Sequence, residues 1–253
     1  MSSFETIIYE KQDGVARVTL NRPQALNRYN IKMRDELYEV LSAVRDDPDV
    51  QVVIFSGVGE RAFCVGADLT EFGTAPSPVI ARQVRWERDV WGLLDSLKQP
   101  LIAALHGYVL GSGVEIALFC DIRIASIDAV FGMPEVALGM IPAAGGSQML
   151  PRTIGIGKAL QLLLNCEYID SEEALRIGLI NRVVSREELL SVAEAMAKDI
   201  KANNSVAVRH AKEAVKRGRD LPLEQGLALE RRLAGILRSL AGDEFPVKKA
   251  VLV

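Results

Sequence analysis

The sequence of 253 residues contains only two histidines, His106 and His210, and three cysteines, Cys64, Cys120 and Cys166. A His-rich metal site, an HExxH metalloprotease motif and a CxxC pair for zinc or redox chemistry are therefore absent. No GxSxG motif accompanies the histidines, and neither a GxxxxGK[ST] phosphate loop nor a complete GxGxxG fingerprint occurs. These absences weigh against metalloenzymes, triad hydrolases and nucleotide-dependent transfer of a hydride or a phosphoryl group.

Long apolar runs and an excess of basic charge are also missing. The longest apolar runs, PLIAAL and VEIALFC, fall well short of the roughly 20 residues that a membrane-spanning helix needs. The N-terminal segment lacks the basic stretch and apolar run of a secretory signal. A formal charge of -3 weighs against nucleic acid as the main partner, although the basic segment 209–219 leaves a phosphate or RNA site as an alternative to a solvated helix face. We therefore expect a cytoplasmic protein without membrane contact.

Hydrophobic periodicity predicts strands that alternate with helices, followed by a part that is nearly all helix. A DG pair between two apolar segments indicates a hairpin. The strands are expected at 5–11, 15–21, 49–57, 100–111 and 121–126, and the helices at 31–47, 78–99 and 112–120. Because alternating strands and helices favour a parallel sheet, we expect an α/β core of about 140 residues on which a helical C-terminal part packs.

Glu115 lies in the segment GYVLGSGVEIALFCD, within an apolar run that follows two glycines. Residues 112 to 115 spell S-x-x-E, so one interpretation is a capping box in which the glutamate binds the N-cap amide. The helix that follows is apolar on every face, and its burial would raise the pKa of Glu115 and suit it to proton transfer. Free amides at the same helix start could hold negative charge on an oxygen. The residues alone leave both interpretations open.

Two further stretches carry similar features. Glu135 follows Pro134 in FGMPEVALGM, among apolar neighbours, although a single loop glutamate is more often solvated. In RAFCVGADL, Gly66 and Ala67 lie between a buried strand and a helix that Asp68 could cap, which by itself indicates only a strand-to-helix turn. Neither stretch alone decides between a structural and a functional role.

Taken together, the three stretches resemble the crotonase superfamily, the enoyl-CoA hydratase/isomerase family. The matching segments, in the order of the family, are LNRPQALN, RAFCVGADL, PLIAALHGYVLGSGVEIALFCDIRIAS, FGMPEVALGMIPAAGGSQMLPR and EALRIGLINRVV. The resemblance implies an α/β fold, a crotonase-like spiral of ββα units at 1–195. It also implies a helical trimerisation region at 196–253 that packs on this core and on neighbouring subunits, in a homotrimer or a dimer of trimers.

The resemblance further implies the residues of the site. The amides of Ala67 and Ser112 are expected to hold the oxygen of a thioester enolate, Glu115 to activate a water for attack on Cβ, and Glu135 to hold that water and protonate Cα. Residues expected to bind the acyl-CoA are Ala25, Leu26, Asn27, Gly66, Ala67, Asp68, Leu69, Gly111, Ser112, Pro134 and Gly145. No metal or redox cofactor is implied, because the thioester and the two amides carry the electronic demand, and coenzyme A is counted as part of the substrate.

We therefore expect an enoyl-CoA hydratase, a lyase of fatty acid metabolism that adds water reversibly across the 2,3 double bond of a 2-enoyl-CoA thioester and gives a 3-hydroxyacyl-CoA. The alternatives are another acyl-CoA reaction of the family, such as double-bond isomerisation or hydrolysis of a thioester or ring, and an RNA-binding relative whose only support is the basic segment 209–219. The length and shape of the acyl group stay open.

The chain departs from the usual family pattern at several positions. Ser112 stands where glycine is usual, and Thr70 and Met149 replace a lysine and an arginine. The C-terminal end is reduced to GDEFPVKKAVLV, in which Phe245, Lys248 and Lys249 are candidates to reach coenzyme A.

Overall fold

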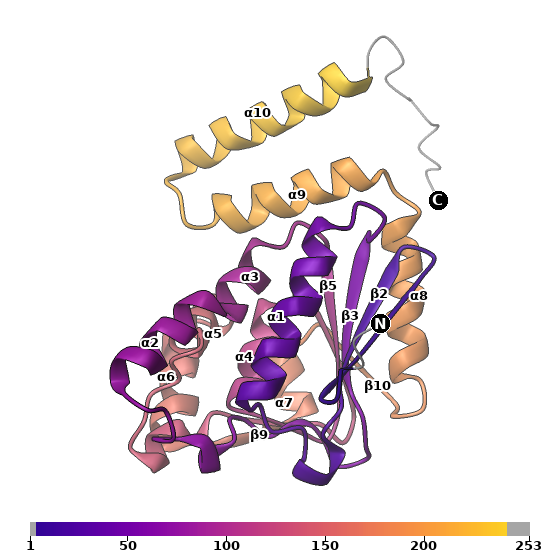
Figure 1. Cartoon of the computed structure of the whole chain (residues 1–253). Coiled ribbons are helices and arrows are strands. Elements are labelled where there is room, and N and C mark those ends of the chain that lie inside the picture. The colour runs from indigo at the N-terminus through magenta and orange to yellow at the C-terminus, as the bar shows by residue number, and fades with distance from the viewer. Residues whose placement is uncertain (1–3, 242–253) are drawn as a thin grey trace. The chain divides into compact units, whose positions relative to one another are not determined.

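The computed structural model describes residues 4–241, so the candidates Phe245, Lys248 and Lys249 lie outside the described residues. Within this range the chain divides into two compact units, the first ending at Asp199 and the second beginning at Ile200. The first unit holds two β-sheets and most of the helices (Figure 1). The division of the chain at 195/196 that the sequence suggested stays a prediction.

The larger sheet has six strands in the order β1-β2-β3-β5-β7-β10. Its strands are β1 (Ile7–Gln12), β2 (Val15–Leu20), β3 (Val52–Gly57), β5 (Leu101–Leu105), β7 (Ile122–Ser126) and β10 (Arg182–Val184). All neighbours are parallel except β1 and β2, which form the expected hairpin. Its turn places Asp13 and Gly14 at positive φ, as a tight hairpin turn requires. The predicted α/β architecture with a largely parallel sheet is confirmed.

The smaller sheet has four short strands in the order β4-β6-β8-β9. They are β4 (Ala62–Cys64), β6 (Tyr108–Leu110), β8 (Val130–Gly132) and β9 (Tyr168–Asp170). The strands β4, β6 and β8 are parallel neighbours, so the segments that follow them leave the sheet at the same edge. This edge positions the candidate site.

Helices cover both faces of the larger sheet. On one face, α1 (Ile31–Asp46) buries Met33, Leu37 and Leu41 in the core and contacts β1 and β2. Because strand side chains alternate between faces, Arg17 of β2 points the other way and binds Glu194 of α8 (Leu189–Lys201) at 2.8 Å. The remaining helices of this unit are α2 (Pro78–Glu87), α3 (Val90–Ser96), α4 (Ser112–Phe119), α5 (Gly146–Ile154), α6 (Ile156–Asn165) and α7 (Ser171–Arg176), with the 3-10 helices η1 (Pro23–Ala25), η2 (Leu69–Glu71) and η3 (Pro134–Leu138).

The prediction of a single long helix at 78–99 is wrong, because the structure has two helices there, α2 and α3. Arg88 leaves the helical region with φ of -120° and ψ of 51°. The side chain of Asp89 then accepts a hydrogen bond from the amide of Gly92 at 2.9 Å and caps the new helix. A favourable N-cap residue inside a continuous apolar pattern thus starts a second helix.

The second unit contains α9 (Ser205–Gly218) and α10 (Leu223–Ala241), which pack against each other. The basic segment 209–219 lies on α9, as the helical interpretation predicted. None of the helices among residues 4–241 is both long enough and apolar enough to cross a membrane.

Candidate active site

Three segments singled out in the sequence follow the carboxyl ends of neighbouring strands. Gly66 and Ala67 follow β4, Ser112 follows β6, and Glu135 follows β8. Since β4 pairs with β6 and β6 with β8 in parallel, these segments converge at one edge of the smaller sheet. Fold topology therefore brings together residues that are up to about seventy positions apart in the chain.

The amide of Ala67 points away from the adjacent segment around Tyr29. Tyr29 donates its amide to the carbonyl of Gly66 at 2.9 Å, and the amide of Asp68 donates to the carbonyl of Tyr29 at 2.8 Å. This parallel bridge uses the residues on either side of Ala67 and leaves its N–H on the opposite side. Within residues 4–241 this N–H has no acceptor. Gly66 permits the turn through its φ of +97°.

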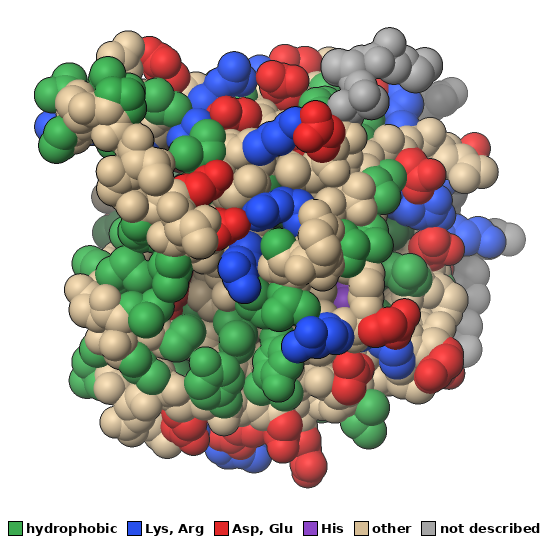
Figure 2. Space-filling model, turned by 60° about the horizontal axis from the view of Figure 1, so that its bottom comes forward, with side chains coloured by type: hydrophobic (Ala, Val, Ile, Leu, Met, Phe, Trp, Pro, Cys, Tyr) green, Lys and Arg blue, Asp and Glu red, His purple; other side chains and the backbone are tan. Residues whose placement is uncertain are grey.

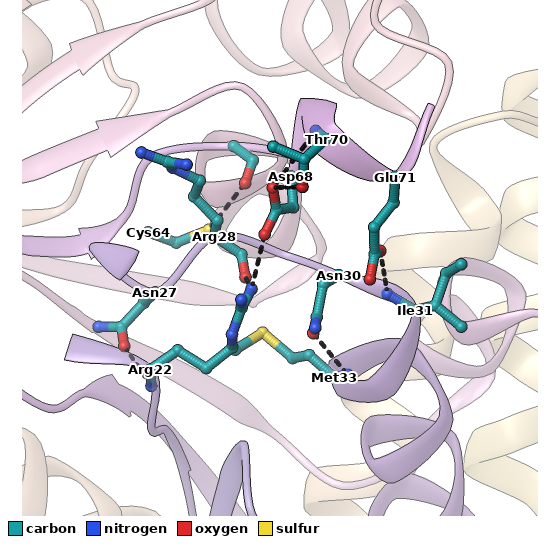
Figure 3. Close-up of polar contacts among 11 residues, drawn as sticks. Arg22, Asn27, Arg28, Asn30, Ile31, Met33, Cys64, Asp68, Thr70 and Glu71 are labelled. Atoms are coloured by element: carbon teal, nitrogen blue, oxygen red, sulfur yellow. Dashed lines mark hydrogen bonds and ion pairs between the residues drawn. The ribbon is translucent and has the colours of Figure 1, made fainter. Parts of the chain in front are cut away.

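Side-chain hydrogen bonds and an ion pair hold the loop that contains Ala67 and Asp68 (Figure 3). Arg22 donates to Asp68 at 3.1 Å and to the carbonyl of Arg28 at 2.7 Å. The hydroxyl of Thr70 donates to the other carboxylate oxygen of Asp68 at 2.8 Å. The hydrogen bonds from Thr70 and Arg22 hold the pKa of Asp68 below its ordinary value in spite of its burial. Asp68 thus stays ionised and fixes the chain immediately after Ala67.

Asn27 ties the segment around η1 to the connection between β3 and β4. Its fully buried side chain donates to the carbonyls of Val58 and Ala62, each at 3.0 Å, and accepts from the amide of Arg22 at 2.8 Å. Leu26 and Asn27 both have positive φ, a backbone conformation that residues other than glycine rarely adopt. The polar atoms of Asn27 are therefore used within the fold.

The second amide belongs to Ser112, the first residue of α4. Gly111 precedes it at φ of +50°, and the Ser112 amide, like other amides of a first helical turn, has no acceptor within residues 4–241. A Cβ atom on Gly66 would lie 3.8 Å from the Ser112 amide nitrogen, so the two amide-bearing segments are in contact. Gly113 allows this approach, because a Cβ there would overlap the carbonyl oxygen of Cys64.

Glu115 is 2% exposed and lies in the first turn of α4. One carboxylate oxygen accepts from the amides of Ala144 at 2.9 Å and Gly146 at 3.0 Å. Burial raises the pKa of Glu115, and the nearby Glu135 adds to this increase, while the two amides and the Ser112 side chain act against it. The capping-box interpretation is wrong: Gly111 is the N-cap residue, without a side-chain cap, and Glu115 binds amides far along the chain.

Glu135 is held differently. It is half-buried at the start of η3, and a Cβ atom on Gly111 would lie 2.8 Å from its Oε1. Its Oε2 is buried without a hydrogen-bond partner among the described residues. Burial raises the pKa of Glu135, and only a hydrogen bond from its own backbone opposes this. The two carboxyl groups thus differ in their hydrogen-bond donors: Glu115 accepts from two backbone amides, and Oε2 of Glu135 accepts from no described residue.

Comparison with known proteins identifies the family to which the chain belongs. The model of the enoyl-CoA hydratase/isomerase family matches residues 10–241. The chain is 42% identical to a short-chain-enoyl-CoA hydratase of Clostridium acetobutylicum over 229 residues, which cover 90% of this chain and 88% of that one. The chain belongs to the enoyl-CoA hydratase/isomerase family. It is also 39% identical to a crotonyl-CoA hydratase of Syntrophomonas wolfei, over 92% of this chain and 90% of that relative.

A solved enoyl-CoA hydratase structure from Bacillus anthracis superimposes with a TM-score of 0.86 at 36% identity and covers 91% of this chain and 90% of that chain. The predicted family and the crotonase-like α/β fold with C-terminal helices are therefore confirmed. The relatives likewise support the predicted enzyme class, an enoyl-CoA hydratase.

In this family member the structure brings most of the predicted site residues to one place. Those at or beside the convergent edge are Gly66, Ala67, Asp68, Gly111, Ser112, Glu115, Pro134, Glu135 and Gly145. Leu69 is the exposed first residue of η2, while Ala25, Leu26 and Asn27 form the supporting loop. Their contacts with a substrate stay predictions.

Sequence reasoning missed the partners that orient these groups. The amides of Ala144 and Gly146 hold Glu115, and Arg22 braces Asp68. The small residues of the segment PAAGGSQ were a usable signal, since a close backbone approach needs glycine or alanine. Within residues 4–241 no group of three or more His, Cys, Asp or Glu side chains could hold a metal ion.

Proposed function

We propose that this chain adds water to the 2,3 double bond of a 2-enoyl-CoA thioester, with Glu115 as base and Glu135 as acid. The observation that carries the proposal is the convergence of a buried and a half-buried carboxyl group with unequal hydrogen bonding beside two amides without acceptors among the described residues. The amides of Ala67 and Ser112 bind the thioester oxygen and stabilise the enolate that forms on it. One such donor typically contributes about 2.7–4 kcal/mol to the transition state.

The two carboxyl groups begin the reaction in opposite protonation states. Glu115 is the ionised member of the pair, because it has amide donors that Glu135 lacks, and it takes a proton from water as the water oxygen bonds to Cβ. The electron pair of the double bond moves to the thioester oxygen. Glu135 is protonated, because its Oε2 is buried without a donor, and it delivers its proton to Cα. The product is a 3-hydroxyacyl-CoA, and one proton must then pass from Glu115 to Glu135.

The test is turnover of a panel of 2-enoyl-CoA and 3-enoyl-CoA thioesters of different length and shape, followed by mass. A gain of one water from 2-enoyl substrates supports the proposal, and the best substrate identifies the acyl class. Isomerisation of 3-enoyl substrates without a gain of water, or release of free coenzyme A, would replace it with another reaction of the family. Salt-sensitive RNA binding without turnover of any thioester would point to a binding protein.

We further propose that the chain self-associates as a trimer or a dimer of trimers. Large apolar side chains of the first unit lie exposed, among them Ile127, Ile141, Ile156, Leu160, Leu164 and Tyr168. Figure 2 shows hydrophobic side chains gathered in the left half of one face. Apolar patches of this kind are typical of interfaces. Light scattering after size-exclusion chromatography tests this, and a monomer would contradict it.

The cytoplasmic location and the absence of a cofactor stay predictions.

A further inference from the structure

An ion pair lies at the amino ends of the strands that lead into the site. Arg186, in the connection between β10 and α8, binds Oδ2 of Asp128 at 3.3 Å. Asp128 lies in the connection between β7 and β8, at the edge of the smaller sheet opposite the convergent edge. We propose that Arg186 and Asp128 are positioning residues that set the spacing of the amides of Ala67 and Ser112. This inference rests on the proposed function, in which both amides bind the thioester oxygen.

The Arg186–Asp128 pair contacts three segments at once. Nη2 of Arg186 donates to the carbonyls of Gly59 and Glu60, shortly before β4, at 3.2 and 3.3 Å. Oδ2 of Asp128 also accepts from the amide of Gly107, immediately before β6, at 3.2 Å. Asp128 itself lies shortly before β8. One guanidinium and one carboxylate thus hold the starts of β4, β6 and β8, the strands whose carboxyl ends carry the site.

Strand pairing gives β4 and β6 only a short and irregular ladder. Each strand has three residues, and the register of their pairing shifts between Ala62 and Cys64. Such an irregularity interrupts the ladder hydrogen bonds that would otherwise fix the spacing of the strands. At their amino ends the two strands approach closely, because a Cβ atom on Gly107 would overlap the carbonyl oxygen of Arg61. The ion pair therefore adds side-chain contacts where the ladder is least regular.

A shift at the amino ends passes readily to the site. Three residues of strand span about 10 Å, so little chain separates the ion pair from the two amides. The strength of a hydrogen bond depends on its distance and angle, so a change in spacing weakens at least one bond to a shared oxygen. Loss of one such donor typically lowers kcat by about 10²–10³-fold. We expect a partial misalignment to cost about tenfold.

Exposure of the Arg186–Asp128 pair separates this role from a contribution to folding. The two side chains are 26% and 44% exposed. An ion pair in contact with water adds little to stability, so its loss should lower Tm by no more than about 2–4 °C. A positioning role therefore predicts a larger effect on the site than on folding.

The experiment compares Arg186→Met, which removes the guanidinium and keeps most of the stem, with the unchanged chain. Two probes are titrated: acetoacetyl-CoA, which ionises readily to an enolate that absorbs in the near ultraviolet, and butyryl-CoA, which does not. The Kd of acetoacetyl-CoA should rise about tenfold in Arg186→Met, while that of butyryl-CoA should change by less than about twofold, because only the enolate needs both amides at full strength. For crotonyl-CoA hydration, kcat should fall about tenfold with KM nearly unchanged.

Asp128→Ala tests the other member of the pair. It should weaken binding of acetoacetyl-CoA as Arg186→Met does. The double variant should show no more than the larger single effect, because residues that act as a unit are not additive. Additive effects of the two substitutions would contradict a joint role.

Arg17→Met is the matched control. Arg17 binds Glu194 at 2.8 Å, and the two side chains are 36% and 48% exposed, but this pair joins α8 to the larger sheet. Its loss should leave the Kd of both probes unchanged. The inference is overturned if Arg186→Met binds acetoacetyl-CoA as the unchanged chain does, if both probes weaken equally, or if Arg17→Met gives the same shift. Failure of the proposed function is distinguishable, because the unchanged chain would then hydrate no 2-enoyl-CoA, whereas enolate binding is measured without turnover.

Discussion

Glu36 of α1 and Glu115 of α4 are both buried glutamates that accept hydrogen bonds from amides, yet their pKa values move in opposite directions. Burial opposes ionisation of Glu36, but the hydroxyl and amide of Thr6 and the amide of Glu5 outweigh it and lower its pKa. In Glu115, burial and the neighbouring Glu135 outweigh the donors and raise the pKa.

The difference teaches how a structural carboxylate is told from a reactive one. Glu36 uses both oxygens to tie the start of the chain to α1, at distances of 2.6 to 3.0 Å. Glu115 has both of its amide donors on a single oxygen and shares the convergent edge with a second carboxyl group. Burial and hydrogen bonds are common to both, so the second carboxyl and the two amides without acceptors mark the reactive one.

The largest expected effect separates the two glutamates by activity. Glu115→Gln removes the base without changing the shape of the side chain, and kcat for hydration should fall by about 10²–10⁴-fold. Glu36→Gln is the matched control and should retain turnover, because Glu36 lies outside the convergent edge. Steady-state kinetics on 2-enoyl-CoA thioesters measure both. Near-full activity of folded Glu115→Gln would show that Glu115 is not the base.

The next effect tests what brings α4 to the site. Gly113→Ala places a Cβ atom against the carbonyl of Cys64, which must move, and should lower the free energy of unfolding by about 3 kcal/mol and reduce activity. Gly157→Ala in α6 meets no atom within 4 Å and should raise stability by up to about 1 kcal/mol. Chemical denaturation measures both variants, and equal effects would contradict close packing of α4 on β4.

A smaller loss of stability should follow when Glu36 is replaced. Glu36→Gln keeps one acceptor oxygen for Thr6 but turns an NH2 group toward the amide of Glu5, so a hydrogen bond to a charged acceptor is lost at a cost of about 2 kcal/mol at neutral pH. Because the folded pKa of Glu36 is lowered, its contribution is complete above the unfolded pKa of about 4.3 and is lost as pH falls through the folded pKa. The difference between the two proteins should therefore shrink in acid. A difference independent of pH would show that charge is not involved.

The smallest expected effect has the opposite sign. Burial raises the folded pKa of Glu135, so the native protein binds more protons than the unfolded chain above the unfolded pKa of about 4.3. Its carboxyl therefore destabilises the fold increasingly as pH rises toward the folded pKa. Glu135→Gln should raise Tm, and the gain should grow with pH over that window. A gain that is constant with pH, or a loss, would contradict a raised pKa.

Part of this organisation could be predicted from local sequence pattern. Alternation around Asp13 and Gly14 predicted the hairpin, and the apolar runs predicted β3, β7 and α4. Strands of three residues such as β4, β6 and β8 are too short to show periodicity, so the smaller sheet that gathers the site could not be foreseen.

The candidate site divides in the same way. The family segments identified Ala67, Ser112, Glu115 and Glu135, but local spacing suggested that Glu115 caps its own helix. Its actual donors are separated from it by 29 and 31 residues, and only the folded chain brings them near. Pairwise spacing within one segment cannot report such contacts.

The most direct test of the account is a titration of the two carboxyl groups by carbon NMR, with side-chain-labelled glutamate and the variants Glu115→Gln and Glu135→Gln for assignment. Both groups should titrate above the ordinary range of glutamate, and Glu115 should lose its proton at a lower pH than Glu135, since its two amide donors favour the charge. Titration of both groups in the ordinary range, or ionisation of Glu135 first, would contradict the assignment of Glu115 as base and Glu135 as acid.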